Sequence, residues 1–238
     1  MRIHRFVIDA ALASGPLTVR DAGLRNQLEN VLRLAPGDAL ELCDGKGMEA
    51  SASVLGFGKT SVDFAVDEVR RNAAESLVRA ALYLAVLKRE NFELAAQKAT
   101  EAGASRIVPV VSRRTVKTGL KQDRLARIVK EATEQSGRGI VPAVSEPLSF
   151  KEALEDAAAN DRNIFFELGG SPFAPGPSGR ASVGLFIGPE GGWDDAETAA
   201  AREHGAVIAS LGPRVLRAET AAAVASYLAA RSGEEGMH

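Results

Sequence analysis

The stretch SVGLFIGPEGGWDDAETAAA, residues 182–201, decides the fold of this 238-residue chain. It opens with Val183–Ile187, a near-continuous apolar run typical of a strand covered on both faces. A glycine-rich loop, Gly188–Gly192, follows at once, and Asp194 and Glu197 then have the spacing that caps the start of a helix. This order predicts a βα unit whose loop lies at the carboxyl end of a parallel strand, where ligands bind. The alternative is a tight turn that needs glycine only for its geometry.

The same alternation of strand and helix extends from Leu77 to the end of the chain and predicts an α/β domain, residues 73–238, with a mostly parallel sheet. Strands are expected at Ala80–Leu87, Arg106–Val111, Asn163–Leu168, Ser182–Ile187 and Ala206–Leu211. Helices are expected at Asn91–Ala102, Gln122–Gln135, Phe150–Ala159, Asp194–His204 and Ala218–Ala230.

Residues 1–72 predict a smaller β-rich domain, with a linker at Arg70–Ser76. Its strands are expected at Ile3–Ile8, Ala39–Cys43, Glu49–Leu55 and Ser61–Val66. One helix interrupts them, with Asp21 as its N-cap and one apolar face formed by Leu24, Leu28, Val31 and Leu32. The segment GKGMEA, residues 45–50, has the spacing of a dinucleotide-binding loop, but alternating residues follow it, so we interpret it as a hairpin turn.

Composition excludes several classes of protein. The single cysteine, Cys43, rules out an internal disulfide, and three scattered histidines do not supply a zinc site, so no metal is expected. No apolar run is long enough to span a membrane, and no export signal is recognised at Met1–Leu12, so a cytoplasmic protein is expected.

Although the net charge of the chain is only −2, residues 105–140 form a basic segment that contains nine Lys or Arg and three acidic residues. Such a cluster favours contact with nucleic acid over an ordinary solvated face.

Two further loops follow predicted strands, one at Leu168–Gly170 and one at Leu211–Thr220. Together with Gly188–Gly192 they are expected to enclose a pocket, because the carboxyl ends of parallel strands share one edge of the sheet. Gly169–Arg180 is too rich in Gly and Pro to predict regular structure, so a loop over the pocket is expected there. Charged side chains beside the pocket either shift the acidity of a substrate or form an ordinary surface ion pair: Arg214, Arg217 and Glu219.

Several of these motifs, in the same order, resemble the bacterial 16S ribosomal RNA (uracil-N3)-methyltransferases, the RsmE family of the SPOUT class. The resemblance covers nearly the whole chain and rests on residues 2–6, 31–38, 44–47, 97–101, 134–138, 188–192 and 211–221. The sequence departs from the family pattern at Gln27 in place of histidine, Ala102 in place of leucine and Trp193 in place of phenylalanine.

The resemblance implies a homodimeric, S-adenosylmethionine-dependent enzyme that acts on 16S ribosomal RNA or the small ribosomal subunit. It also implies a PUA-like β-barrel at 1–72 and a trefoil-knotted methyltransferase domain at 73–238. The implied cofactor-binding residues are Leu168, Gly169, Ile187, Gly188, Pro189, Glu190, Gly191, Leu211, Gly212, Val215, Leu216 and Arg217. The implied catalytic residues are Arg217, Glu219, Glu190 and Arg214. RNA contacts are expected from Arg5, Arg33, Lys88, Arg113, Arg114 and Arg138.

Two other functions are compatible with the same motifs. A 2'-O-ribose RNA methyltransferase of the same class would use the same cofactor on a hydroxyl group. A non-catalytic RNA-binding ribosome assembly factor would use the basic segment but would need no cofactor pocket.

Overall fold

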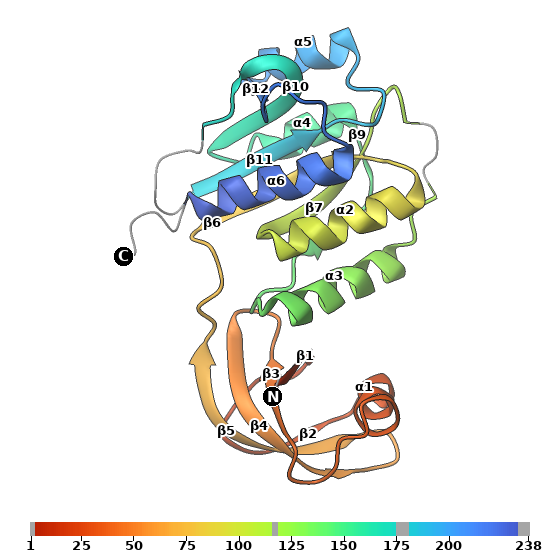
Figure 1. Ribbon diagram of the computed structural model, residues 1–238, viewed down its shortest axis with the longest axis vertical. Coiled ribbons are helices and arrows are strands. Elements are labelled where there is room, and N and C mark those ends of the chain that lie inside the picture. The colour runs from red at the N-terminus through yellow and green to blue at the C-terminus, as the bar shows by residue number, and fades with distance from the viewer. Residues whose placement is uncertain (1–2, 116–118, 175–180, 233–238) are drawn as a thin grey trace. The chain divides into compact units, whose positions relative to one another are not determined.

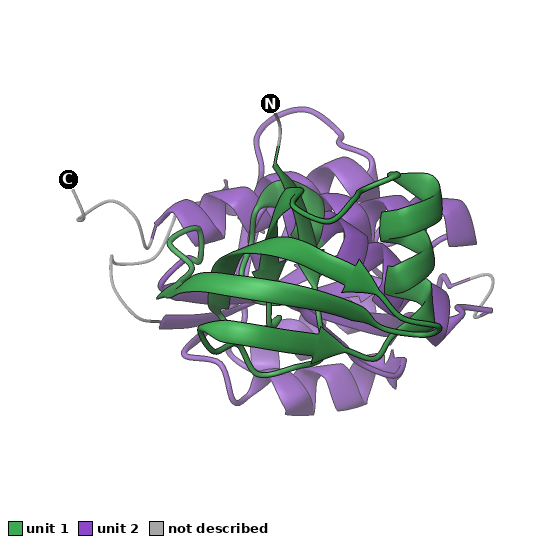
Figure 2. Ribbon diagram, turned by 90° about the horizontal axis from the view of Figure 1, so that it is seen from below, with its two compact units in different colours: residues 1–75, 133–141 green, residues 76–132, 142–238 purple. Residues whose placement is uncertain are grey.

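The computed structural model describes residues 3–115, 119–174 and 181–232, and it divides into two compact units. The first unit comprises residues 1–75 and 133–141, and the second comprises 76–132 and 142–238 (Figure 2). A segment from the middle of the chain therefore belongs to the amino-terminal unit, which no pattern in the sequence predicted. Lys117 of the basic segment, residues 175–180 of the expected loop and Arg2 lie outside the described residues.

The first unit is built on a five-stranded sheet with the order β1-β3-β4-β5-β2. Its elements are β1 (His4–Val7), β2 (Gly15–Val19), α1 (Ala22–Asn26), the π-helix η1 (Gln27–Val31), β3 (Ala39–Cys43), β4 (Met48–Phe57) and β5 (Val62–Arg71). The β1–β3 pair is parallel and the other pairs are antiparallel. Residues 44–47 join the antiparallel strands β3 and β4, so the hairpin interpretation of residues 45–50 is confirmed.

Three expectations for this unit need correction. The predicted linker begins too early, because β5 continues to Arg71 and pairs there with Met48. Strand β2 was not predicted, since it is a short edge strand that pairs only with β5. Asp21 caps α1 as expected, but Val31 is exposed because the helix changes to π geometry after Asn26, which shifts the apolar face.

The second unit has three layers, a parallel sheet with helices on each of its two faces. The strand order of the sheet is β12-β10-β11-β6-β7-β8, and β9 also pairs with β7. Its strands are β6 (Val78–Ala85), β7 (Ala104–Val111), β8 (Ala143–Val144), β9 (Leu148–Ser149), β10 (Arg162–Pro172), β11 (Ala181–Ile187) and β12 (Val207–Ser210). Its helices are α2 (Arg89–Glu101), α3 (Gln122–Ser136), α4 (Phe150–Ala157), α5 (Asp195–Glu203) and α6 (Ala218–Arg231). The expected α/β fold with a mostly parallel sheet is confirmed, and each predicted helix is present.

Helices cover both faces of this sheet (Figure 1). Helices α2 and α6 lie side by side over β6, β7 and β11, while α4 and α5 contribute to a core on the other face. That core contains the stacked rings of Tyr83 and Phe186, whose centroids lie 4.5 Å apart. Burial on both faces explains why β6 and β11 consist almost entirely of buried residues.

Strand β10 corrects the expected loop at Gly169–Arg180. The strand continues to Pro172 after a bulge, because Phe166 and Ser171 both pair with Ala209 of β12. A Cβ atom at Gly170 would lie 2.7 Å from the Ala209 backbone, so only glycine allows the two strands to approach here. The glycines that suggested a loop therefore form a bulge within a strand.

Candidate functional site

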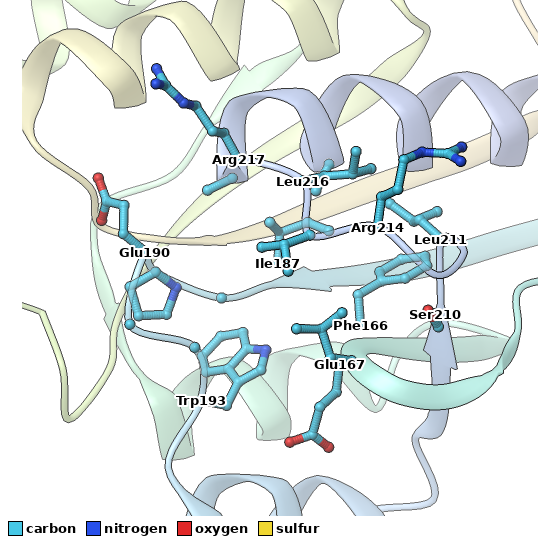
Figure 3. Close-up of a pocket in the computed structure, with 18 of the residues that line it drawn as sticks. Phe166, Glu167, Ile187, Glu190, Trp193, Ser210, Leu211, Arg214, Leu216 and Arg217 are labelled. Carbon is cyan, nitrogen blue, oxygen red and sulfur yellow. The ribbon is translucent and has the colours of Figure 1, made fainter.

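A cavity of about 530 Å³ lies at the carboxyl ends of β10, β11 and β12 in the second unit (Figure 3). Three segments that are distant in sequence form its wall. The lining residues are Phe166, Glu167, Leu168, Ile187, Gly188, Pro189, Glu190, Gly191, Gly192, Trp193, Ser210, Leu211, Gly212, Arg214, Val215, Leu216, Arg217, Ala218 and Ala221. The cavity therefore lies where the three predicted loops were expected to meet, because the parallel strands carry all three to one edge of the sheet.

The loop after β11 is held at both ends. At its start the Gly192 amide donates to the Pro189 carbonyl at 2.8 Å, which closes a tight turn. At its end Asp194 and Glu197 form the predicted capping box at the start of α5. Both anticipated functions of the glycines are thus combined, since the segment is a tight turn and also a wall of the cavity.

Arg113 and Arg114, which follow β7, hold this same loop. The Arg113 amide donates to Glu197 Oε1 at 2.9 Å, and its guanidinium group lies 3.3 Å from Asp194 Oδ1. The Arg114 guanidinium donates to the Gly191 carbonyl. The side chain of Arg113 is still 69% exposed, so these contacts leave it accessible to a ligand from solution.

The segment after β12 contributes the basic side of the cavity. Ser210 Oγ accepts from the Gly212 amide at 3.2 Å and donates to the Gly212 carbonyl at 2.9 Å, which shapes the turn. Arg214 and Arg217 line the cavity and are exposed. An Arg217 nitrogen lies 4.0 Å from a carboxylate oxygen of Glu219 in the first turn of α6, a loose ion pair in which Arg217 remains 87% exposed.

The two carboxylates among the implied catalytic residues, Glu190 and Glu219, differ in position. Glu190 lines the cavity, is exposed, and accepts a hydrogen bond from Asn91 Nδ2 at 3.2 Å. Glu219 is not among the lining residues, and its side chain is only 14% exposed. Glu190 and Arg217 come from different loops and lie at the same end of the cavity (Figure 3).

The cavity combines apolar walls with a few polar groups. Ile187, Leu211 and Leu216 supply aliphatic surface, and Trp193 supplies a buried aromatic face. The indole Nε1 of Trp193 has no hydrogen-bond partner among the described residues, although it is buried. Apolar walls with few and specific polar groups are typical of sites that bind a small molecule.

Most of the predicted cofactor-binding residues line this cavity, and Gly169 does not because it lies within the β10 bulge. Seven lining residues are not among the named cofactor-binding or catalytic residues, although Gly192 and Ala218 lie within the expected loops: Phe166, Glu167, Gly192, Trp193, Ser210, Ala218 and Ala221. Phe166 and Glu167 directly precede the predicted loop, and Trp193 directly follows the glycine loop. Extending each loop by two residues toward its flanking element would have found most of them.

The six arginines and lysines expected to contact RNA fall into two groups. Arg33, Lys88, Arg113 and Arg114 are exposed, and Arg33 has a left-handed backbone with φ of 57°. Arg138 is buried and Arg5 is largely buried, with a side chain that is 9% exposed, so these two residues offer little surface for the predicted RNA contact. In the sequence their positive charge suggested contact with RNA. In the structure both guanidinium groups form ion pairs with carboxylates of the first unit.

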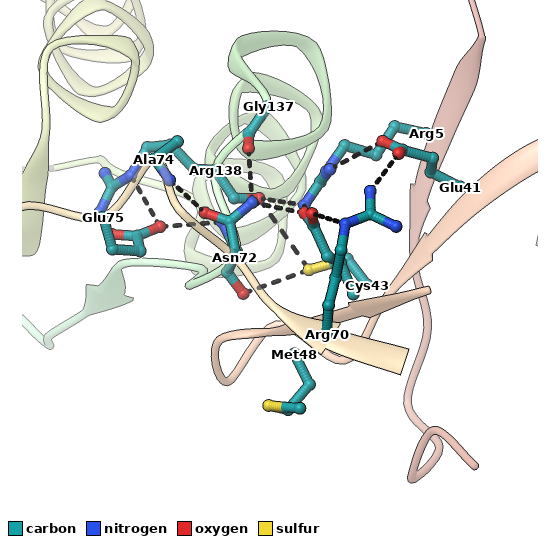
Figure 4. A network of polar contacts seen from close by, with 12 residues as sticks. Arg5, Glu41, Cys43, Met48, Arg70, Asn72, Ala74, Glu75, Gly137 and Arg138 are labelled. Atoms are coloured by element: carbon teal, nitrogen blue, oxygen red, sulfur yellow. Dashed lines mark hydrogen bonds and ion pairs between the residues drawn. The ribbon is translucent and has the colours of Figure 1, made fainter. Parts of the chain in front are cut away.

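These partners form a buried polar network in the first unit (Figure 4). Arg5 lies 2.7 Å from Glu49 Oε2 and 3.0 Å from Glu41 Oε2, and Arg138 lies 2.8 Å from Glu75 Oε2. Burial would raise the pKa of Glu49, but hydrogen bonds from Asn72 and Arg5 outweigh it and hold that pKa below its ordinary value. The network attaches the segment 133–141 to the β-sheet.

Within residues 3–115, 119–174 and 181–232, no three His, Cys, Asp or Glu side chains gather as metal ligands would. Among the same residues no helix has the length and apolar character needed to cross a membrane.

Comparisons with known proteins agree on one family. A family model described as an RNA methyltransferase domain matches residues 74–230. The chain is 31% identical over 212 residues to ribosomal RNA small subunit methyltransferase E of Bacillus subtilis, with 82% of each chain covered. It is 33% identical over 236 residues to the protein of the same name from Mycobacterium bovis, covering 92% of this chain and 88% of that one.

Solved structures show the same likeness. The crystal structure of a ribosomal RNA small subunit methyltransferase E from Neisseria gonorrhoeae, bound to S-adenosyl methionine, superposes with a TM-score of 0.86. The two chains are 28% identical, and the match covers 94% of this chain and 95% of that one. The likeness therefore extends over both units rather than over the parallel sheet alone.

Proposed function

This chain belongs to the ribosomal RNA small subunit methyltransferase E family, and we propose that it transfers a methyl group from S-adenosylmethionine to N3 of a uridine in 16S ribosomal RNA. The observation that carries the proposal is the convergence of three loops on one cavity with apolar walls and a basic edge. The neighbour from Neisseria gonorrhoeae, which is similar over nearly its whole length, binds S-adenosyl methionine.

The residues of the cavity fit this methyl donor. Ile187, Leu211 and Leu216 provide apolar surface for its adenine ring, and backbone groups of the loops supply hydrogen bonds. Arg214 is a cation suited to its carboxylate. When bound, S-adenosylmethionine supplies an electrophilic methyl group on a sulfonium sulfur.

The chain must then make uridine N3 nucleophilic, because this imide nitrogen carries a proton at neutral pH. Arg217 stabilises the resulting anion, since a nearby guanidinium lowers the pKa of an acid by about one to three units. Glu190 accepts the proton, because it is the carboxylate that lines the cavity near Arg217. Glu219 then acts through Arg217, which it orients from the first turn of α6.

Positioning contributes more than proton transfer in this scheme. General-base assistance accounts for about a 100- to 10,000-fold acceleration. Alignment of the nucleophile with the methyl carbon is worth roughly 7 to 11 kcal/mol, which is a larger factor. The turns at Gly188 and Gly212, which position the reactants, therefore contribute more to the rate of methyl transfer than either carboxylate does.

RNA binding is assigned to the first unit together with the exposed basic residues Arg33, Lys88, Arg113 and Arg114. The five-stranded sheet with its buried core supports a PUA-like β-barrel at about residues 1–72, with segment 133–141 completing it. An RNA substrate of this kind also implies a cytoplasmic location.

A trefoil knot and a homodimer are part of the proposal for residues 73–238. The strand order and the packing of α6 on β6 and β11, after a segment that lines the cavity, support the knot. Exposed Leu94 on α2 and Tyr227 on α6 support a dimer, because these neighbouring helices leave apolar side chains uncovered.

The test is a methyl-transfer assay with tritium-labelled S-adenosylmethionine and either 16S ribosomal RNA or small ribosomal subunits. After digestion to nucleosides, the label is expected in 3-methyluridine. Label on a ribose 2'-oxygen would instead identify the alternative methyltransferase. Binding of RNA without any transfer or any affinity for S-adenosylmethionine would identify a non-catalytic assembly factor.

A further inference from the structure

We propose that Arg89 and Arg124 together bind one phosphate of the RNA backbone, and that Glu93 holds their two guanidinium groups in place for it. The inference deepens the proposed function and rests on it. It adds a phosphate site on helices α2 and α3 to the residues for which RNA contact was expected, which include neither arginine.

Glu93, near the start of α2, is shared by the two arginines. Its Oε1 accepts from Arg89 Nε at 3.0 Å, one turn earlier on α2, and from Arg124 Nε at 2.7 Å, in the first turn of α3. The Glu93 side chain is only 11% exposed, whereas those of Arg89 and Arg124 are 46% and 44% exposed. One largely buried carboxylate therefore holds two accessible guanidinium groups next to each other, where α2 and α3 begin (Figure 1).

Each arginine is bound through its inner nitrogen. Among the described residues, the side chains of Arg89 and Arg124 form hydrogen bonds only through Nε, so their outer nitrogens, Nη1 and Nη2, are available to a ligand. A guanidinium group presents its N–H donors in a fixed planar fork, and the outer edge of that fork matches the oxygens of a phosphate. Two adjacent forks suit one phosphate, whose oxygens they share.

One carboxylate does not balance two guanidinium groups. The hydrogen bond from Arg124 outweighs burial and, with that from Arg89, holds the pKa of Glu93 below its ordinary value, so Glu93 is ionised at neutral pH. The three groups together still keep an excess positive charge. Glu90 and Asp123 are exposed in the first turns of the same helices, but within the described part of the chain neither forms an ion pair with the two arginines. A phosphate supplies the missing negative charge.

The first turn of α2 also connects this site to the cavity. Asn91 donates to Glu190, a carboxylate of the cavity wall, at 3.2 Å. Positions 89 and 93 lie on one face of the helix and position 91 lies on another, so the same turn contacts both α3 and the loop after β11. We therefore assign to the arginine pair a phosphate close to the nucleotide that is methylated.

The sharpest test preserves the charge. A double variant, Arg89→Lys with Arg124→Lys, keeps both cations, but lysine has one nitrogen, which cannot hold Glu93 and also present a planar fork to a phosphate. The loss of charge-assisted hydrogen bonds should weaken binding to 16S ribosomal RNA about tenfold in a filter-binding assay at fixed salt. Unchanged RNA affinity would show that charge alone matters and would overturn the inference.

Alanine variants test whether the two arginines share one phosphate. The double variant Arg89→Ala with Arg124→Ala should lose less RNA affinity than the product of the two single losses, because both side chains act on one group. Its plot of log affinity against log salt concentration should be shallower by about 0.7, the value for one phosphate of a single strand. A change of about 1.4 would indicate two separate phosphates and would overturn the shared site.

Glu93 is tested as a positioning residue. If charge alone mattered, Glu93→Ala would bind RNA more tightly, because it removes a negative charge. Loss of the group that holds the arginines predicts the opposite, about threefold weaker binding, since both side chains must then be ordered by the phosphate. Glu93→Gln retains an oxygen that accepts the two Nε bonds, so it should restore the affinity of the unaltered protein. Tighter binding in Glu93→Ala would contradict the holding function.

Lys151→Ala is the matched control. Lys151 is an exposed cation of the same unit that lies 3.8 Å from Glu155 on α4, so its loss should change RNA affinity by less than about twofold. A loss equal to that of the arginine variants would overturn the inference. All variants should bind S-adenosylmethionine normally, because none of these side chains lines the cavity, and a loss of that affinity would assign the arginine pair to folding instead. If the unaltered protein bound no RNA, the proposed function would fail as well.

Discussion

At the scale of single residues, the shape of the cavity depends more on the close contact of Gly188 with the Trp193 ring than on the charged residues at its rim. Gly188 lies against the Trp193 ring, and a methyl group at position 188 would be only 3.1 to 3.2 Å from three atoms of that ring. The charged residues at the rim are more loosely held, as the 4.0 Å separation of Arg217 and Glu219 shows. Substitutions at these two kinds of position should therefore differ in their effect.

Gly188→Val is expected to weaken binding of S-adenosylmethionine by at least about tenfold, because the valine side chain meets the Trp193 ring in the cavity wall. Calorimetry measures the loss. Gly56→Val is the matched control, because no atom lies within 4 Å of a Cβ added at Gly56 and its φ is not positive. Unchanged affinity in Gly188→Val would contradict the assignment of the pocket.

Glu190→Gln is expected to lower kcat by about 100- to 10,000-fold, because it removes the proton acceptor. Glu219→Gln should leave measurable activity, since Glu219 acts only through Arg217. Single-turnover methyl transfer measured for both variants distinguishes the two carboxylates. A larger loss in Glu219→Gln than in Glu190→Gln would reverse their proposed functions.

At the scale of elements, the loop between β11 and α5 is supported from a second strand end. The segment after β7 supplies Arg113 and Arg114, which contact Asp194, Glu197 and the Gly191 carbonyl. The basic segment thus stabilises the wall of the cavity and also presents exposed charge. Arg114, which contacts the cavity wall, is therefore compared below with Arg33, an exposed arginine of the first unit.

Arg114→Ala is expected to weaken binding of S-adenosylmethionine as well as RNA, because its guanidinium group holds Gly191 in the cavity wall. Arg33→Ala in the first unit should weaken RNA binding alone. RNA affinity measured against salt concentration should show a shallower slope for Arg33→Ala, since fewer counterions are released on binding. If neither variant changes that slope, the exposed arginines are not the RNA-binding surface.

At the scale of the whole molecule, the chain passes between the two units three times, at residues 75–76, 132–133 and 141–142. The segment 133–141 is tied to the first unit by buried contacts. The Val7 amide donates to Glu134 Oε1 at 2.9 Å, and the Gly137 carbonyl accepts from Asn72 at 3.0 Å. The first unit is therefore incomplete when it is cut out as a continuous piece.

A fragment of residues 1–75 is expected to lack a cooperative unfolding transition, because Glu75 and Asn72 lose their partners in segment 133–141. Thermal unfolding followed by circular dichroism measures this. The intact chain serves as the comparison. A fragment that unfolds cooperatively, at the same temperature as the first unit of the intact chain, would show that the segment is dispensable.

Acid should destabilise the network of the first unit. The folded state holds the pKa of Glu49 below its ordinary value of 4.5, so ionised Glu49 stabilises the fold above that pH. This contribution to stability is lost progressively as the pH falls from 4.5 to below the lowered pKa that Glu49 has in the folded state.

Glu49→Gln should lower the free energy of unfolding by about 1.5 to 3 kcal/mol at neutral pH, and the stability of the variant should depend less on acid. Urea unfolding at several pH values measures both effects, and a variant with the acid dependence of the unaltered chain would contradict the assignment.

The sequence by itself determined the α/β class, the position of each helix in the second unit and the three segments that form the cavity. These features depend on local patterns: apolar runs mark buried strands, and the capping box at Asp194 and Glu197 marks the start of α5. Only the tertiary structure decided that Arg5 and Arg138 pair with carboxylates of the first unit, that segment 133–141 joins this unit, and that Gly170 lies in a strand. Each of these depends on a contact between residues far apart in the chain, such as Arg5 with Glu49 or Gly170 with Ala209, and local sequence carries no record of such a partner.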